Sequence, residues 1–330
     1  LVMSPEGNVT DLTPGIGHKA GFAGWSSDEA SFYVFSNERD GGAFDMYRYD
    51  ADDYSREVLY ENTDGLDLGA ISRDGRRVGY ARNNSNADSD LFLIDLMEDE
   101  LELINTTPHE GDVEHSAMGF TPDSSQFIYS TNEFGEFRQA WTLSLQSGER
   151  EALVADNWDV LYVGYSPSGR YRVSGVNNDA STDVTLTDLM TGSDVVISDV
   201  PDGDLAQIRF NRDETAIAFG INRDTAPTDL YHMPLGGDAY RLTRALNPAI
   251  NNDLMVEGEV VRFASYDGLQ IPGILYKPNE ASPDNPVPAL VWVHGGPGGQ
   301  SRKGYSAVIQ HLVNHGYAVY QINNRGSSGY

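Results

Sequence analysis

The sequence predicts a mostly β protein in which a β-propeller is followed by the start of an α/β domain. Two observations point to this architecture. A polar turn recurs about every 45 residues through the first three quarters of the chain, and a glycine-rich loop follows an apolar strand near residue 294. A period of this size with β-type turns is typical of four-stranded propeller blades. With 330 residues and 39% hydrophobic content, the chain is long enough for more than one domain with a buried core.

The repeat is marked by an apolar residue followed by a polar turn. The turns are marked by residues spaced 46, 49, 45 and 45 apart, namely Asp28, Asp74, Asp123, Ser168 and Asp213. Each mark precedes an apolar second strand, and a polar hairpin loop leads on to a third strand. Five full blades are therefore predicted.

A sixth blade is present only in part. Residues 1–13 match residues 231–243 in their turn and in their closing Leu-Thr pair, so the chain is expected to open on the last two strands of a blade. Blades bury their apolar faces only against neighbours. We therefore expect a truncated amino-terminal end or a complementing fragment, and we assign residues 1–250 to the propeller.

A second domain is predicted over residues 254–330. The run Asn251-Asn252-Asp253 marks the exit from the repeat. Beyond it, Val260 to Ser265 and Ile271 to Tyr276 flank an Asp-Gly pair, which indicates a β-hairpin.

The stretch Val291-Trp292-Val293-His294 predicts a parallel strand that is covered on both faces, because its apolar residues do not alternate with polar ones. A loop containing Gly295 and Gly296 follows. Glycines allow a ligand to approach main-chain N–H groups. In acyl transfer, one such donor to the oxyanion contributes roughly 3 to 4 kcal/mol.

The elements predicted after this loop indicate the type of domain to which it belongs. Apolar pairs at helical spacing predict a helix over residues 305–314, and a second apolar strand is expected over Ala318 to Ile322. The order of strand, loop, helix and strand is that of the start of an α/β-hydrolase domain. Two internal strands and one helix do not supply enough layers to cover each other.

Two motifs carry a resemblance to a known family. His294-Gly295-Gly296-Pro297-Gly298-Gly299, followed about thirty residues later by Asn324-Arg325-Gly326-Ser327-Ser328-Gly329-Tyr330, resembles the prolyl oligopeptidase family of serine peptidases, in particular its acylaminoacyl-peptidase and dipeptidyl-peptidase members. The resemblance implies that the N–H of Gly296, in the loop it shares with Gly295, is an oxyanion donor. It also implies that Arg325 braces the active-site rim; the alternative is a surface arginine.

His294 stands where other members of that family carry a tyrosine whose hydroxyl donates to the oxyanion. Donation by His294 and shaping of the loop are both open, and shaping is favoured. The nucleophile itself is absent, because no serine has glycines two residues before and two after it. The resemblance implies that the serine, aspartate and histidine of the triad follow Tyr330. The chain alone is therefore predicted to be inactive, and its partner is the remainder of the hydrolase domain, in the same polypeptide or in a complementing chain.

Composition excludes several classes of partner. The chain has 22 Lys and Arg against 50 Asp and Glu, a formal net charge of −28. Such a surface repels nucleic acid and anionic membranes. There is no cysteine, so neither disulfides nor thiolate metal sites are expected. The compartment is left undecided, with an exported or periplasmic setting slightly favoured over the cytoplasm.

No cofactor and no metal site are predicted. Residues 83–90 and 177–183 carry oxygen side chains at alternate positions, as calcium loops do, but lack the glycine and glutamate of an EF-hand. Asn and Asp also favour turns by bonding their own backbone. Both segments are therefore interpreted as solvated hairpin loops.

Two functions remain. In the first, the chain is the propeller and oxyanion-loop portion of a serine peptidase whose substrates are short peptides, since a propeller restricts access to a site between domains. In the second, it is a non-catalytic propeller that binds or scaffolds other proteins. A glycine loop between two buried strands favours the first.

Overall fold

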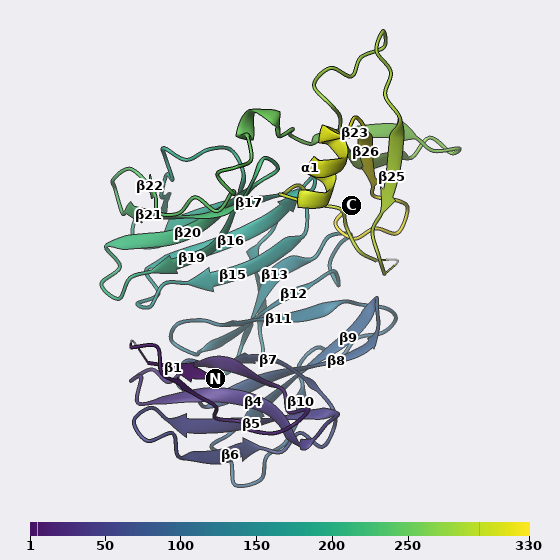
Figure 1. Cartoon of the computed structure of the whole chain (residues 1–330). Helices are drawn as coiled ribbons and strands as arrows, with labels where there is room; N and C mark the ends of the chain where they lie inside the picture. The colour runs from purple at the N-terminus through teal and green to yellow at the C-terminus, as the bar shows by residue number, and fades with distance from the viewer. Residues whose placement is uncertain (5, 297) are drawn as a thin grey trace. The chain divides into compact units, whose positions relative to one another are not determined.

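The computed structural model of the chain describes residues 1–4, 6–296 and 298–330. Within these residues it is mostly β, with a two-stranded sheet, five four-stranded sheets in chain order, and a mixed sheet at the C-terminal end (Figure 1). It divides into two compact units, Leu1–Ala155 and Asp156–Tyr330. The division at residues 250–254 expected from the sequence stays a prediction.

The first unit holds a two-stranded sheet and sheets 1, 2 and 3, which are antiparallel with strands in sequence order. Its strands are β1 (Val2–Met3) and β2 (Val9–Thr10); β3 (Ala20–Trp25), β4 (Ser31–Asp40), β5 (Ala43–Asp50) and β6 (Arg56–Tyr60) of sheet 1; β7 (Asp67–Ile71), β8 (Arg77–Ser85), β9 (Asp88–Asp95) and β10 (Ile104–Asn105) of sheet 2; β11 (His115–Phe120), β12 (Gln126–Thr131), β13 (Gln139–Ser144) and β14 (Arg150–Val154) of sheet 3.

The second unit holds sheets 4 and 5, of the same kind, and the C-terminal sheet with one α-helix. Its elements are β15 (Val160–Tyr165), β16 (Tyr171–Asn178), β17 (Ser181–Asp188) and β18 (Ser193–Asp194) of sheet 4; β19 (Asp204–Phe210), β20 (Ala216–Arg223), β21 (Ala226–Pro234) and β22 (Tyr240–Arg241) of sheet 5; the 3₁₀ turn η1 (Asn252–Leu254); β23 (Glu259–Ala264), β24 (Gln270–Tyr276), β25 (Ala289–Val293), α1 (Ala307–Asn314) and β26 (Ala318–Ile322).

The polar segment that recurs in the sequence forms the turn between the first and second strands of each of the five sheets. In sheet 2, the Ser72 hydroxyl donates to Asp74 at 2.6 Å, and Gly75 follows with a φ of 70°. The residue after the mark has a positive φ in all five sheets: Glu29, Gly75, Ser124, Gly169 and Glu214. A left-handed residue lets the chain reverse into the second strand. The repeat predicted from the sequence is thus confirmed as a repeat of backbone geometry.

Within each unit, neighbouring sheets bury apolar faces against one another. Between sheets 1 and 2, Met46, Val78 and Ile94 are fully buried. Sheets 4 and 5 pack in the same way around Leu186 and Ile217. This packing is the nearest-neighbour core expected of a repeat array.

The first residues pair as two strands, as predicted. β1 and β2 form an antiparallel pair, and Val2 packs against the buried cluster of sheet 1. The Tyr49 hydroxyl donates to the carbonyl of Leu12 at 3.3 Å. These residues cover the face of sheet 1 that sheet 2 leaves free.

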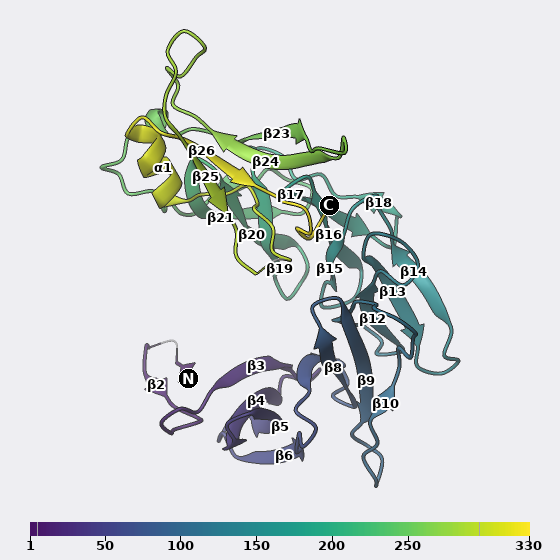
Figure 2. The same cartoon turned by 90° about the vertical axis from the view of Figure 1, so that its right-hand side faces the viewer.

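The C-terminal sheet has the strand order β23-β24-β26-β25 (Figure 2). β23 and β24 form the predicted hairpin, β24 pairs antiparallel with β26, and β26 pairs parallel with β25. Helix α1 is capped by the Ser306 hydroxyl, which accepts from the Ile309 N–H. Ile309 and Val313 of the helix pack on Ile274 and Val319 of the sheet.

One prediction for this sheet is wrong in the described chain. β25 was expected to be covered on both faces, yet it is an edge strand whose residues are all exposed, with Val291 at 66% and Val293 at 62%. The physical reason is the shortage of layers: β25 pairs only with β26, and the described elements leave more than half of the surface of Val291 and Val293 uncovered.

Candidate active site

The glycine loop begins directly after β25. His294 is partly buried, whereas Gly295 and Gly296 are exposed. Gly296 has a φ of 54°, and the Gly299 N–H donates to the Gly296 carbonyl at 3.0 Å. Within the described residues, neither the Gly295 nor the Gly296 N–H has an acceptor. Both donors are thus available to a ligand. Pro297, in the same predicted loop, lies outside the described residues.

The His294 ring joins this loop to the loop that follows β26. Its Nε2 lies 2.8 Å from the Ser327 hydroxyl oxygen, and that hydroxyl donates to the Asn324 carbonyl at 2.6 Å. A hydroxyl has one hydrogen to donate. When it bonds Asn324, His294 donates from Nε2, and the ring is held by the second loop.

Further contacts fasten the two loops together. The Ser328 N–H donates to the Gly299 carbonyl at 3.1 Å. Asn323, which is 2% exposed, accepts from the Ser301 N–H at 2.7 Å and donates to the Ser301 carbonyl at 3.0 Å. Hydrogen bonds between buried polar groups fix a local geometry. The glycine loop is therefore built on a braced pair of loops.

Arg325 lies on the second loop, but its side chain is directed to the β23–β24 hairpin. Its guanidinium donates to Asp267 at 2.7 Å and lies over the ring of Tyr266, 5.3 Å from the centroid. The bond from Arg325 lowers the pKa of the Asp267 carboxyl. The structure therefore brings His294, Gly295 and Gly296 together, and it places Arg325 on the neighbouring loop with its charge on the hairpin.

Sheet 4 contributes to the same region through residues that sequence reasoning missed. Asn177 donates to the Gln300 side chain at 3.2 Å and also accepts a hydrogen bond from Arg302. Arg302 donates to the Thr182 hydroxyl at 2.7 Å and lies 3.5 Å from the Asp204 carboxylate. The segment after the glycine loop is thus bonded to the β16–β17 hairpin.

This hairpin departs from the interpretation of residues 177–183 as a solvated loop. Asn177 is 1% exposed and Ala180 is fully buried, because the C-terminal sheet and α1 cover the hairpin tip. In the segment 83–90, residues 83 to 87 are exposed as expected, whereas Ser89 is 5% exposed and its hydroxyl donates to the His115 carbonyl at 2.7 Å. Among the residues described, no group of three or more His, Asp or Glu side chains is arranged to hold a metal ion.

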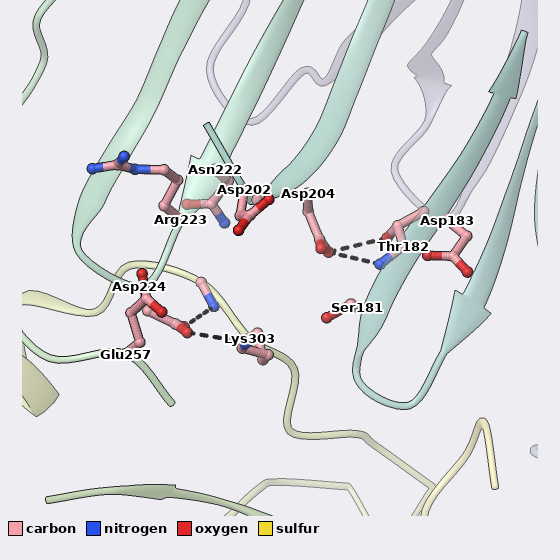
Figure 3. Close-up of a pocket in the computed structure, with 12 residues that line it drawn as sticks. Ser181, Thr182, Asp183, Asp202, Asp204, Asn222, Arg223, Asp224, Glu257 and Lys303 are labelled. Carbon is pink, nitrogen blue, oxygen red and sulfur yellow. Dashed lines mark hydrogen bonds and ion pairs between the residues drawn. The ribbon is translucent and has the colours of Figure 1, made fainter. Parts of the chain in front are cut away.

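A cavity of about 390 Å³ lies beside these contacts (Figure 3). Its charged lining comprises Asp183, Asp202, Asp204, Arg223, Asp224, Glu257 and Lys303. Burial raises the pKa of Asp204, which accepts from the Thr182 N–H at 3.0 Å. With five carboxylates against two cations, the cavity has a negative potential.

In the part of the chain that the structure covers, no helix has both the length and the apolar character that crossing a bilayer requires.

No protein-family model matches the chain. Dipeptidyl aminopeptidase BIII of Pseudoxanthomonas mexicana is 25% identical over 333 residues, which cover 98% of this chain and 48% of that protein. A puromycin-hydrolyzing peptidase of Mycobacterium tuberculosis superposes with a TM-score of 0.74 at 14% identity, over 95% of this chain and 52% of the other. Prolyl oligopeptidase B from Galerina marginata gives a TM-score of 0.72 at 14% identity, over 93% and 45%.

The chain thus spans about half the length of the relatives that it matches. The structural likeness agrees with a mostly β, propeller-type fold, and the sequence match extends over almost the whole chain. These findings confirm the resemblance predicted from the two motifs: the relatives and structural neighbours of this chain are peptidases of the prolyl oligopeptidase and dipeptidyl aminopeptidase family.

Proposed function

We propose that the chain is the propeller and oxyanion-loop portion of a serine peptidase that hydrolyses short peptides, of the oligopeptidase, acylaminoacyl-peptidase or dipeptidyl-peptidase type. The observation that carries the proposal is the pair of exposed N–H groups of Gly295 and Gly296, which follow a parallel strand and lack an acceptor in the described chain. Donors held in this way suit an oxygen that becomes negative during acyl transfer.

In this proposal Gly296 donates its N–H to the oxyanion, with Gly295 beside it. His294 shapes the loop through Ser327, since its Nε2 is already 2.8 Å from that hydroxyl. A serine attacks the peptide carbonyl, a histidine takes its proton, and an aspartate orients the histidine. These three residues belong to the remainder of an α/β-hydrolase domain, which follows Tyr330 or is supplied by a complementing chain.

The exposed edge of the C-terminal sheet supports a larger hydrolase domain. Parallel strands in proteins are normally covered on both faces. β25 has an unpaired edge, and Val291 and Val293 are more than half exposed. A further strand beside β25 and a layer over its face would bury these side chains. We assign residues 254–330 to the first part of that domain and residues 1–250 to the propeller.

The test uses the protein that contains this chain together with the residues that complete its sheet. It should hydrolyse chromogenic dipeptidyl or N-acetyl-aminoacyl anilides and should be labelled on a serine by a fluorophosphonate probe. The isolated chain should remain unlabelled.

Gly296→Ala should lower kcat about 10- to 100-fold with little change in KM, because strain at its positive φ moves the donor. Gly268→Ala is the matched control: its φ is 88°, it has open space around a Cβ, and it lies in the β23–β24 hairpin. A completed protein that neither cleaves peptides nor takes the label would overturn the proposal in favour of a propeller scaffold.

A further inference from the structure

Each four-stranded sheet of the repeat carries an asparagine at or near the end of its second strand. The five are Asn37, Asn83, Asn132, Asn177 and Asn222. Their spacings of 46, 49, 45 and 45 residues are those of the turn marks, so they occupy equivalent places in the repeat.

In sheets 1, 2 and 3 this asparagine bonds within its own sheet. Asn37 accepts from the Lys19 N–H at 2.6 Å, and Asn132 accepts from the Glu114 N–H at 2.8 Å. Asn83 donates to the carboxylate of Asp67 at 2.9 Å. Lys19 and Glu114 directly precede the first strand, and Asp67 begins it. The shared role is to fasten the first strand to the second.

In sheets 4 and 5 the side chain of the same asparagine also bonds the C-terminal segment. Asn177 donates to Gln300 at 3.2 Å and to the Gly329 carbonyl at 3.5 Å. Asn222 accepts from the Tyr305 N–H at 3.3 Å. Asn177 thus contacts both loops of the candidate active site through its Nδ2.

The approach is close enough to require glycine opposite each asparagine. A Cβ at Gly329 would lie 2.0 Å from Asn177 Nδ2, and a Cβ at Gly304 would lie 2.5 Å from Asn222 Nδ2. Both glycines also have positive φ values, of 78° and 145°. A side chain at either place would push the loop away from its sheet.

In sheets 4 and 5, and not in the other three, an aspartate stands two residues after the asparagine. Asp179 accepts from Arg262 at 2.6 Å, and Asp224 accepts from the Gly258 and Gly304 N–H groups at 3.0 and 2.7 Å. The equivalent residues of sheets 1, 2 and 3 are Arg39, Ser85 and Phe134. The Asn-x-Asp pattern therefore coincides with the sheets that bind the C-terminal segment.

We propose that Asn177 and Asn222 are positioning residues of the candidate active site, which hold the segments after β25 and β26 so that the Gly295 and Gly296 N–H groups keep a fixed direction. The inference rests on the proposed function for its catalytic meaning. Asn177 is 1% exposed and is fixed on a strand, so the position of the loops is set by sheet 4.

Hydrogen exchange measured by mass spectrometry on this chain tests the positioning without any catalysis. Asn177→Ala should speed exchange about tenfold in residues 298–304 and 326–330, because the loop bonds are lost. Asn132→Ala is the matched control: it should speed exchange near Glu114 and leave both loops unchanged. Asn177→Asp, which keeps the acceptor for Arg302 but loses the donor, should give a smaller increase in the same loops.

A second test combines substitutions. Gly329→Ala should loosen the same loops more in the parent chain than in the Asn177→Ala chain, where the close contact has been removed. If Asn177→Ala and Asn177→Asp keep β19 and β20 protected and leave hydrogen exchange in both loops at the parent level, the positioning role is refuted.

In the completed protein, Asn177→Ala should lower kcat about tenfold and change KM little, and Asn132→Ala should change neither. Loosened loops in a protein that has no peptidase activity would refute the proposed function while leaving the positioning intact. An active protein with loosened loops and an unchanged kcat would refute the catalytic part of the inference.

Discussion

The hydroxyl of Tyr276 donates a hydrogen bond of 2.8 Å to the carboxylate of Asp224, and both side chains are buried. Asp224 lies in the β20–β21 hairpin and Tyr276 ends β24. The same carboxylate accepts from Gly258 and Gly304. One side chain of sheet 5 therefore satisfies three donors of the C-terminal segment, and burial raises the pKa of Tyr276.

Asp224→Ala should destabilise this part of the chain by about 3 kcal/mol, because three donors, of which Tyr276 and Gly258 are buried and Gly304 is partly buried, lose their acceptor. Tyr276→Phe, which removes one donor and leaves the carboxylate two others, should cost about 1 kcal/mol. Urea denaturation followed by circular dichroism measures both. Equal losses for the two variants would contradict a shared acceptor.

His115 should make the first unit sensitive to acid. It is 4% exposed, neither ring nitrogen has a hydrogen-bond partner among the residues that the structure describes, and burial lowers its pKa to about 4. An unfolded histidine binds a proton near pH 6.5. Between about pH 6.5 and 4 the unfolded state therefore takes up the proton first, and stability should fall by on the order of 3 kcal/mol as the pH drops.

His115→Phe should remove most of this loss, and urea midpoints at about pH 7.5 and pH 5 measure it. His109, 4.9 Å away between ring centroids, acts in the opposite sense. Its pKa is raised by the Thr107 carbonyl and by Asp88, and it titrates in parent and variant alike. An acid slope unchanged by His115→Phe would show that another group is responsible.

Alanine substitutions at two glycines of the first unit separate the stability cost of a steric clash from that of backbone strain. Gly75 has a φ of 70°, and its Cβ would lie 2.0 Å from the Tyr33 hydroxyl oxygen. Gly148 has a φ of 74° and open space. Gly75→Ala should cost about 3 kcal/mol and Gly148→Ala about 1, because only the first adds a clash to the strained φ. Thermal unfolding of the two variants checks the difference, and equal costs would contradict it.

The exposed strand β25 should tolerate polar substitution in this chain. Val291→Lys should change its stability by less than about 0.5 kcal/mol and should reduce self-association, because a charge blunts an open sheet edge. Val319→Ala in the neighbouring β26, which is fully buried, should cost about 2 kcal/mol. Urea midpoints and light scattering measure the pair of variants. In the completed protein Val291→Lys should be strongly destabilising, and tolerance there would contradict a covered strand.

Substitution of Arg325 tests whether this residue braces the active site or is only a charged surface residue. The Arg325 and Asp267 side chains are 44% and 39% exposed, so Arg325→Ala should leave the urea midpoint unchanged. If the second loop braces the active site, the same change should lower kcat/KM of the completed protein severalfold. Unchanged activity would leave Arg325 as a surface residue.

The sequence predicted most of the local structure because local rules decide it. The turn marks near Asp74 and Asp213, the hairpin of β23 and β24, and the strand over Ala318–Ile322 all depend on residues close together in the chain. The exposure of Val291 could not be predicted, because burial depends on which layers are present rather than on hydrophobicity.

The candidate site could be predicted only in part. His294, Gly295 and Gly296 are consecutive, so their proximity follows from the chain itself. The contact of His294 with Ser327 joins residues 33 apart, and that of Asn177 with Gly329 joins residues 152 apart. The second contact could not be predicted, because an asparagine in a hairpin is usually a turn residue. Only a comparison of the equivalent asparagines in the five sheets shows that Asn177 differs from the others.

The open edge of the C-terminal sheet carries its own optical reporter. Trp292 lies in β25, two residues before His294, and is 42% exposed. Its fluorescence should therefore be red-shifted and readily quenched by acrylamide in this chain. When another strand or layer covers β25, the emission of Trp292, one of four tryptophans in the chain, should move to shorter wavelength, so that completion of the sheet can be followed without a label by comparison with a Trp292→Phe variant.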